Sequence, residues 1–163
     1  MPVYEREVRV AAPVEEVWEF HSRASGLEAL TPGWMNLRIE DVVGPDGEPE
    51  PDVLETGSRI DSSVRPFGVG PRQRWTSEIV ARERDAGAAM FRDVMTDGPF
   101  REWTHTHSFF ADEGTTLVRD RVEYALPLDG LGDLLGPLAV VGFEPMFRYR
   151  HRKTRELLED APG

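Results

Sequence analysis

The residues of this chain with the most chemical capacity are concentrated in one stretch, Phe91 to Phe110, which reads FRDVMTDGPFREWTHTHSFF. Asp97, Gly98 and Pro99 form a turn signal between two runs of alternating character, a pattern that predicts an antiparallel hairpin. Because side chains alternate across a strand, one face of the second run carries both aromatic rings and imidazoles. The residues on that face are Trp103, His105, His107 and Phe109.

The first run of the hairpin contributes a carboxylate to the same face. A short loop with an odd number of residues would place Phe91, Asp93 and Met95 across the ladder from the histidines. A register change of one residue would substitute Arg92 and Val94.

A second carboxylate comes from the strand predicted over Thr115 to Leu126. Period-two alternation groups Asp120 with Val122 and Tyr124, which favours an inward orientation over a surface ion pair. A buried carboxylate requires a partner. If that partner is His105 or His107, the tautomer of the imidazole is set and its basicity is raised, which serves packing and acid–base chemistry equally.

These groups allow catalysis or metal binding. In an enzyme, His105 or His107 would remove a proton alpha to a carbonyl while an acid such as Asp93 helps water depart. The H-x-H pair also presents two imidazoles to one side, where His151 or Asp120 would complete a metal site. No glycine-rich phosphate loop or serine elbow is present, so the sequence predicts no cofactor, and we expect no resident metal.

The same groups also allow simple binding or a structural role. The histidines would orient one polar end of a small apolar ligand while the aromatic residues bury the rest of it. Alternatively, the histidines are half-buried imidazoles satisfied by a neighbouring carboxylate or carbonyl, and the aromatic residues are core.

The elements that must position these groups follow an α+β order. The patterns predict strands over residues 3–10, 35–43, 58–64, 74–82 and 115–126, in addition to the hairpin. Two short helices are expected after the first strand, one in AAPVEEVWEF and one around Gly26 to Leu30. A glycine-broken helical segment over 130–145 precedes a strong helix that ends near Glu159, with Pro145 in its first turn. Its inward side carries Phe143, Phe147, His151, Thr154 and Leu158.

Composition narrows the class of protein. A chain of 163 residues predicts a single domain over 1–163, and the absence of cysteine excludes disulfides and thiolate chemistry. No apolar run approaches ~20 residues, so we expect no membrane span and a cytoplasmic protein. The net charge of -11 argues against nucleic acid and anionic membrane surfaces as partners. The near absence of lysine fits either a salt-adapted cytoplasm or a GC-rich genome.

Taken in order, the segments VRVAAPVEEVWEF, LTPGWMNLRI, the hairpin, DRVEYALPL and FRYRHRKTRELL resemble the START-like, helix-grip superfamily, also labelled polyketide cyclase/dehydrase-like or SRPBCC proteins. The resemblance covers nearly the whole chain. It implies a curved antiparallel sheet wrapped around a long C-terminal helix, with a mostly apolar cavity between them. Members bind lipids, hormones or quinones, and some catalyse cyclisation or dehydration, so the fold alone does not identify the chemistry.

The sequence therefore predicts a START-like domain that binds a small hydrophobic ligand of lipid, quinone, polyketide or aromatic type. A cyclase or dehydratase is the alternative, and a histidine-based metal site is a weaker one. The ligand identity and the oligomeric state stay open. The predicted ligand-binding residues are Phe91, Asp93, Met95, Trp103, His105, His107, Phe109, Asp120, Val122, Tyr124, Phe147 and His151.

Overall fold

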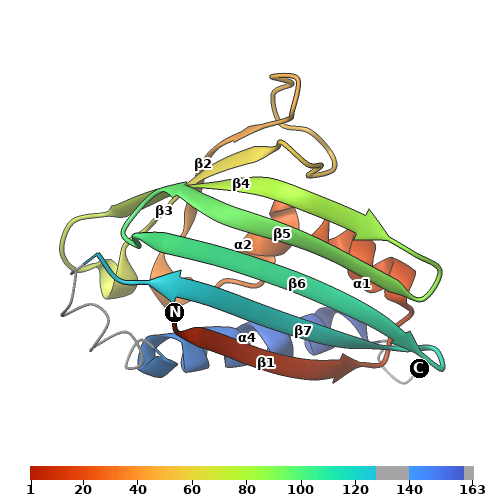
Figure 1. Ribbon diagram of the computed structural model, residues 1–163. Coiled ribbons are helices and arrows are strands. Elements are labelled where there is room, and N and C mark those ends of the chain that lie inside the picture. Colours follow the sequence, from red (N-terminus) through yellow and green to blue (C-terminus); the bar gives the residue numbers. More distant parts are fainter. Residues whose placement is uncertain (128–139, 160–163) are drawn as a thin grey trace.

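The computed structural model describes residues 1–127 and 140–159, which form one curved sheet with helices on its concave face (Figure 1). The strands are β1 (Val3–Val10), β2 (Arg38–Val43), β3 (Arg59–Val64), β4 (Gln73–Arg84), β5 (Ala88–Asp97), β6 (Glu102–Asp112) and β7 (Thr115–Ala125). The helices are α1 (Val14–His21), α2 (Ala24–Ala29) and α4 (Val140–Leu158), with short 3-10 turns η1 (Gly33–Met35) and η2 (Pro66–Gly68).

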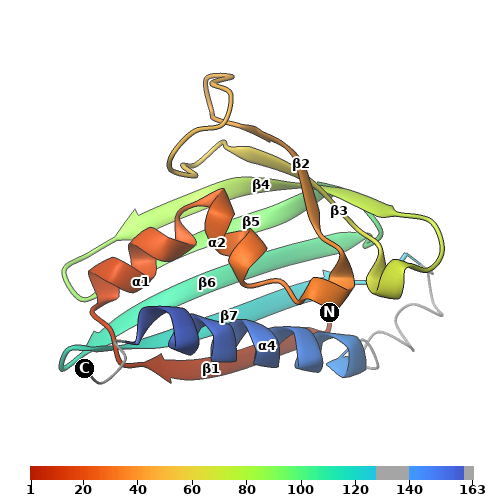
Figure 2. The ribbon, with the colours of Figure 1, turned by 180° about the vertical axis from the view of Figure 1, so that it is seen from behind.

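The seven strands of the described ranges form a single sheet in the order β1-β7-β6-β5-β4-β3-β2, and every neighbouring pair is antiparallel. The chain therefore passes from β1 at one edge to β2 at the other and returns strand by strand to pair β7 with β1. Within the described residues, helices α1, α2 and α4 lie on the same face of the sheet (Figure 2). This arrangement confirms the predicted helix-grip α+β fold.

Helices α1 and α2 lie over the concave face beside α4, on the side away from β1 (Figure 2). Val14, Val17 and Trp18 form a buried stripe on α1, which packs against β6 and β7. Helix α2 begins two residues before the predicted start. Its Gly26 meets the backbone carbonyl of Phe20 so closely that a Cβ atom would overlap it, which makes glycine necessary at this contact.

The predicted strand over 35–43 starts later than expected. Met35 belongs to η1, and Asn36 adopts a left-handed conformation with φ of 52° before β2 begins at Arg38. Asparagine tolerates this conformation better than other non-glycine residues, so the chain can turn sharply there. The amide of Arg65 then donates to the carbonyl of Met35, which ties this turn to the end of β3.

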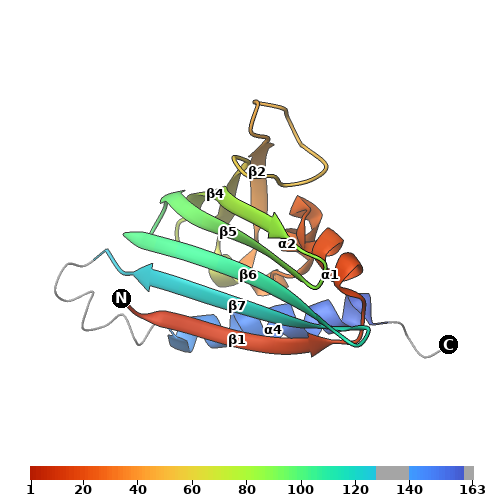
Figure 3. The ribbon, with the colours of Figure 1, turned by 45° about the vertical axis from the view of Figure 1, so that its right-hand side comes forward.

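Helix α4 runs along the sheet close to β1 and β7, as the rotated view also shows (Figure 3). Phe143, Phe147, His151 and Thr154 are buried on its inward side, as predicted. Pro145 lies inside α4 and not in its first turn, because the helix already includes residues 140–144. The part of the predicted glycine-broken helical segment over 130–139 lies outside the described residues. None of the helices in the described ranges has the length and apolar character needed to cross a bilayer.

The buried apolar side chains form two clusters. The larger one joins α1 to the middle of the sheet and contains Trp18, Phe91 and Phe109. The smaller one joins α4 to β1 and β7 and contains Tyr4, Val122, Tyr124, Phe143 and Phe147, with Phe100 and Trp103 packed against it. The polar side chains described next belong to neither cluster.

Candidate functional site

Three adjacent strands bring the predicted histidines and carboxylates together. In the ladder, Asp93 lies opposite His105 and Phe91 lies opposite His107. On the other side of β6, His107 lies opposite Asp120. The β5–β6 ladder ends at Val94 and Thr104, one pair before Met95 and Trp103 would meet. The odd-loop register expected from the sequence is thus the one that the hairpin adopts.

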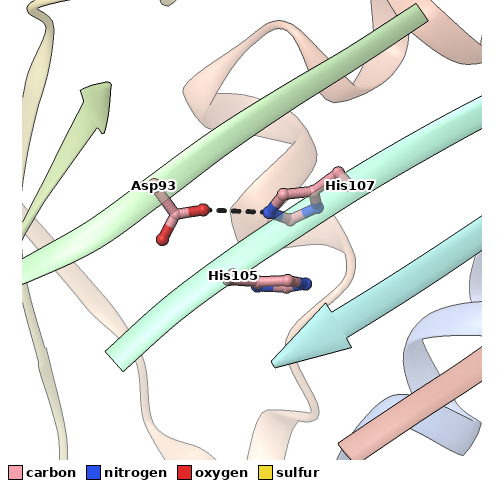
Figure 4. A group of neighbouring side chains, drawn as sticks. All are labelled: Asp93, His105 and His107. Carbon is pink, nitrogen blue, oxygen red and sulfur yellow. Dashed lines mark hydrogen bonds and ion pairs between the residues drawn. The ribbon is translucent and has the colours of Figure 1, made fainter. Parts of the chain in front are cut away.

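The hydrogen bonds connect these residues diagonally across the strands. Nε2 of His107 donates to Oδ2 of Asp93 over 2.9 Å (Figure 4). Nε2 of His105 donates to Oδ1 of Asp120 over 2.7 Å. Nδ1 of His107 lies 3.3 Å from the same Asp120 oxygen, which is close enough for an ion pair although it is poorly aligned for a hydrogen bond. We call Asp93, His105, His107, Asp120 and His151 the His–Asp network.

Helix α4 contributes the last member of this network. Nε2 of His151 donates to Oδ2 of Asp120 over 2.5 Å, so both oxygens of one carboxylate are engaged by imidazoles. Nδ1 of His151 is buried without a hydrogen-bond partner in the described residues. Asp120 therefore links the sheet to the helix that the sheet grips, and only 2% of its side chain is exposed.

The network stabilises charge inside the protein. Burial alone would raise the pKa of Asp120, but hydrogen bonds from His105 and His151, together with the nearby Nδ1 of His107, hold this pKa well below its ordinary value. Burial alone would lower the pKa of His107, but its hydrogen bond to Asp93 and the charges of Asp93 and Asp120 raise it. The pKa of Asp93 is lowered because its hydrogen bond to His107 and the nearby positive charges outweigh burial. At neutral pH, Asp93 is thus a carboxylate, which makes it unsuited to the proton-donating role considered from the sequence.

The pKa of His105 shifts in the opposite direction to that of His107. Burial and the charge of His107 lower the pKa of His105 to about 4. The two rings stack with centroids 3.6 Å apart. A neutral His105 that donates through Nε2 keeps a lone pair on Nδ1, which makes no hydrogen bond to the described residues. The site therefore holds, in contact, one imidazole whose pKa is raised and one whose pKa is lowered.

Two groups that the sequence reasoning missed belong to the same electrostatic neighbourhood. His21 of α1 is buried, and burial and the charge of Arg150 lower its pKa to about 3. Arg150 of α4 also acts on Asp93. Its Nε is buried without a hydrogen-bond partner, and the guanidinium forms no ion pair within the described ranges. The sequence could have indicated the position of Arg150, because it follows Phe147 by three residues and so borders the buried side of α4.

The predicted aromatic lining divides into two parts. Phe91 stacks on His107 at 3.9 Å, and Phe109 is fully buried against Trp18, so both are packed into the larger core cluster. The other part faces α4, where Phe147 lies edge-on to His105 at 5.5 Å. Trp103 is half-buried between Phe100, Phe143 and His105. Met95 is half-buried where the ladder has ended, and Val122 and Tyr124 are fully buried in the smaller cluster.

Exposure shows where a ligand can reach the network. Asp93 and His105 keep 15% and 9% of their side chains exposed, the largest fractions within the network. A hollow of about 370 Å³ lies between β1 and α4 and includes His151, and another of about 500 Å³ lies beside Trp18 and Arg82. Neither is lined by His105, His107 or Trp103, so the predicted interior cavity stays a prediction.

A metal ion does not suit this arrangement. Asp93, His105 and His107 offer ligand atoms within 4.8 Å of one another, with Asp93 in place of the His151 or Asp120 expected from the sequence. However, the two imidazole planes differ by only 28° and lie face to face, so their lone pairs run side by side and do not converge. The Nε2 atom of each ring is already occupied by a carboxylate. We therefore assign no metal-dependent step to the site.

Known structures share the fold at low sequence identity. A protein from Thermus thermophilus aligns with 22% identity and a TM-score of 0.63, over 99% of this chain and 100% of that one. Norcoclaurine synthase from Thalictrum flavum, solved with dopamine and hydroxybenzaldehyde, aligns with 18% identity and a TM-score of 0.66, over 99% and 89% of the two chains. A protein from Arthrobacter aurescens aligns with 14% identity and a TM-score of 0.68, over 99% and 88%.

No curated protein sequence matches the chain at a significant level. A family model matches it from residue 1 to residue 159, which is almost its whole length. The model describes polyketide cyclase / dehydrase and lipid transport proteins. The resemblance expected from the segments of the sequence is thereby confirmed, and the chain belongs to the polyketide cyclase / dehydrase and lipid transport family.

Proposed function

We propose that the protein binds a small, mostly apolar molecule between α4 and the concave face of the sheet, with one polar end of the molecule at the His–Asp network. The observation that carries this proposal is a buried, fully connected set of imidazoles and carboxylates next to a half-buried aromatic wall. Sites for small molecules typically combine a largely apolar lining with a few convergent polar groups.

The polar end of the ligand would approach Asp93 and His105, the members of the network with the most exposed surface. Asp93 accepts hydrogen bonds, and Nδ1 of neutral His105 does the same. Arg150 supplies an unpaired donor that acts on Asp93 from the side of α4. A hydroxyl group facing Asp93 together with a carbonyl or carboxylate oxygen facing Arg150 satisfies these groups, and a planar ring suits the wall of Trp103 and Phe147.

The test titrates the full chain with the fluorescent dye 8-anilinonaphthalene-1-sulfonate, which has both an apolar ring system and an anionic group. Trp103→Ala should weaken dye binding at least fivefold while it costs less than the ~3 to 5 kcal/mol lost on truncation of a fully packed aromatic residue. Arg150→Gln should weaken the dye further than it weakens the uncharged 1-naphthol. Near-UV circular dichroism verifies that the dye reports on folded protein.

A matched control is available on the opposite face of the same strand. Phe110 is half-buried beneath Arg119, so Phe110→Ala should leave dye affinity unchanged. A large stability loss in Trp103→Ala with unaltered dye binding in the folded fraction would show that this face is packed interior, and the proposal would fall. Native mass spectrometry of the purified protein tests the same proposal without a chosen probe.

One observation favours a catalytic role in the same site. Environments that push two neighbouring titratable groups in opposite directions are typical of acid–base pairs, and His105 and His107 are such a pair. In this role Nδ1 of His105 takes a proton alpha to a carbonyl, the electron pair of the broken C–H bond forms a carbon–carbon double bond, and the π pair of the carbonyl moves to its oxygen. Arg150 is the donor available to stabilise that oxygen.

This second role has its own readout. The full chain would catalyse deuterium incorporation from D₂O at the carbon alpha to the carbonyl of 2-tetralone, followed by NMR, and His105→Gln would abolish the enzymatic part. If the wild-type protein binds the dye but 2-tetralone exchanges no faster than in buffer alone, the catalytic role is excluded and binding remains the proposed function.

A further inference from the structure

A patch of exposed apolar side chains lies away from the His–Asp network, on the turns η1 and η2. Trp34 and Phe67 stack with centroids 4.8 Å apart and planes 11° apart. Phe67 is 73% exposed, Val69 is 75% exposed and Trp34 is 38% exposed. We call these three residues the aromatic clip. Both turns lie at the end of the molecule where α4 begins (Figure 2).

The backbone holds the clip in an outward position at some conformational cost. Phe67 has a φ of 56°, which is uncommon for a bulky residue. The turn is closed by hydrogen bonds from the amide of Gly68 to the carbonyl of Arg65 and from Nε of Arg65 to the carbonyl of Gly70. Phe67 stays 73% exposed although it stacks on Trp34, so folding buries little of this strained side chain, and its position indicates an external contact.

Arginines surround the clip in a chain whose net charge is -11. Arg38 and Arg74 flank Ser63 in one row across β2, β3 and β4. Arg72 bonds the Oγ of Ser63 and reaches the carbonyl of Asn36, which joins this row to η1. Burial and the charges of Arg38, Arg65 and Arg74 lower the pKa of Arg72, which shows that the four cations share one region. Glu40 is the acid that acts on this arginine cluster.

We propose that the aromatic clip and the arginine cluster form a docking surface for the anionic phospholipid headgroups of a membrane. The arginines would bind phosphate oxygens while Phe67 and Val69 enter the interface, where Trp34 is also favoured. Three apolar side chains are few for a specific protein interface, which needs roughly 1,000 Å² or more. The net charge of -11 disfavours anionic membranes over the molecule as a whole, but charges beyond about 8 Å are largely screened at physiological salt, so the proposal concerns the local charge.

Phe67→Gly separates membrane binding from folding. Glycine adopts positive φ freely, so this variant should melt at a higher temperature than the wild type and should bind vesicles at least tenfold more weakly. Each basic residue near an anionic surface contributes about a fivefold factor in affinity, so Arg38→Gln combined with Arg74→Gln should weaken binding about 25-fold.

The experiment sediments the full chain with vesicles of phosphatidylcholine alone or with 40 mol% phosphatidylglycerol, at 150 mM salt. Leu157→Ser removes an exposed apolar residue on α4, and Arg59→Gln removes an exposed cation at the start of β3; both should bind as the wild type does. Wild-type binding that is no tighter with phosphatidylglycerol, or Phe67→Gly binding equal to wild type, would overturn the proposal. Concentration-dependent self-association that Phe67→Gly abolishes, without vesicle binding, would assign the patch to a second copy of the chain and also overturn it.

Discussion

Replacement of Asp120 by asparagine tests whether the His–Asp network is organised around one carboxylate. Asparagine has the same shape, so the change creates no cavity. It removes the charge of a carboxylate that is 2% exposed, that His105 and His151 bond, and that lies 3.3 Å from Nδ1 of His107. Removal of one partner from a buried ion pair typically costs about 3 to 5 kcal/mol. We expect Asp120→Asn to lower the free energy of unfolding at pH 7 by that amount.

The orientation of the asparagine amide decides where in this range the loss of unfolding free energy falls. If the new amide NH₂ group replaces Oδ1, it confronts the N–H groups of both His105 and His107. If it replaces Oδ2, it confronts His151 alone, whose other ring nitrogen is already buried without a partner. The second orientation leaves fewer donors unsatisfied, so we expect it, with a loss near the lower end of the range.

The assay is urea denaturation followed by circular dichroism, with Asp93→Asn as the matched control. Asp93 is 15% exposed and accepts one hydrogen bond, from His107, so its replacement should cost only about 1 to 3 kcal/mol. A loss below ~1 kcal/mol for Asp120→Asn, or a loss smaller than that of Asp93→Asn, would contradict the central role of Asp120.

The same variant should change how His107 titrates. A folded pKa above the unfolded value means that His107 stabilises the fold at pH values below about 6.5, and that this contribution is lost as pH rises through the folded pKa. Asp120→Asn removes one of the two carboxylates that raise this pKa, so an NMR titration of the imidazole should move to lower pH. An unchanged titration would show that Asp93 alone sets the protonation of His107.

Three further predictions address acid sensitivity, the hairpin turn and salt. Because the pKa values of His105 and His21 are lowered to about 4 and about 3, the wild type should lose stability as pH falls from about 6.5 to 4, by ~1.4 kcal/mol per pH unit for each histidine. In urea denaturation at a series of pH values, the unfolding free energy of His21→Gln should depend on pH with a slope smaller by one proton. A slope equal to that of the wild type would contradict this prediction. A Cβ at Gly98 would lie 2.7 Å from Cβ of Trp75, so Gly98→Val should lower the free energy of unfolding by about 1 to 3 kcal/mol in thermal denaturation. A Cβ at Gly87 meets open space, so Gly87→Val should change stability little. Equal melting temperatures of the two variants would refute the packing argument. Urea midpoints should rise between 0.1 and 1 M KCl because salt screens the self-repulsion of a chain with net charge -11, and a flat response would leave genome composition as the reason for the scarcity of lysine.

Much of the site follows from alternation along the strands. The faces of β6 and β7 were predictable because one side-chain position in two points inward wherever a sheet has a single buried face. That rule was enough to bring His105, His107 and Asp120 together, and the odd loop added Asp93 opposite His105. The predicted contact between Asp120 and a histidine needed no information beyond strand parity.

The contributions of the helices were harder to predict because helix docking is not local. His151 was expected on the inward side of its helix, but no periodicity states that it meets Asp120 and not another sheet residue. His21 occupies the last turn of α1, where a histidine commonly stabilises a helix end, and its Nδ1 does bond the carbonyl of Val17. Arg150 is one of several arginines of α4, and although its spacing from Phe147 places it beside the buried stripe, only the packing shows that it acts on Asp93.

The arginine cluster and the aromatic clip on the surface could not be predicted from the sequence, for a different reason. Net charge averages over the whole chain, so the excess of acids concealed four arginines that gather around Ser63. The positive φ of Phe67 has no signature in composition, since glycine or asparagine is the residue expected at such a position. A sequence pattern identifies the conformations that residues prefer, and it fails where a residue is held against that preference.

The energetics of the His–Asp network favour a functional role over a structural one. Buried ionic groups lose hydration that their mutual attraction only partly restores, and apolar side chains of similar volume often give an equal or more stable fold. The network occupies positions flanked by two well-packed apolar clusters, where aliphatic residues would extend the core without this loss. A domain that needed only stability would gain little from all four of its histidines in one buried electrostatic neighbourhood. Concentration of perturbed titratable groups at one place is characteristic of binding and catalytic sites, and here that place lies beneath the helix that the sheet grips.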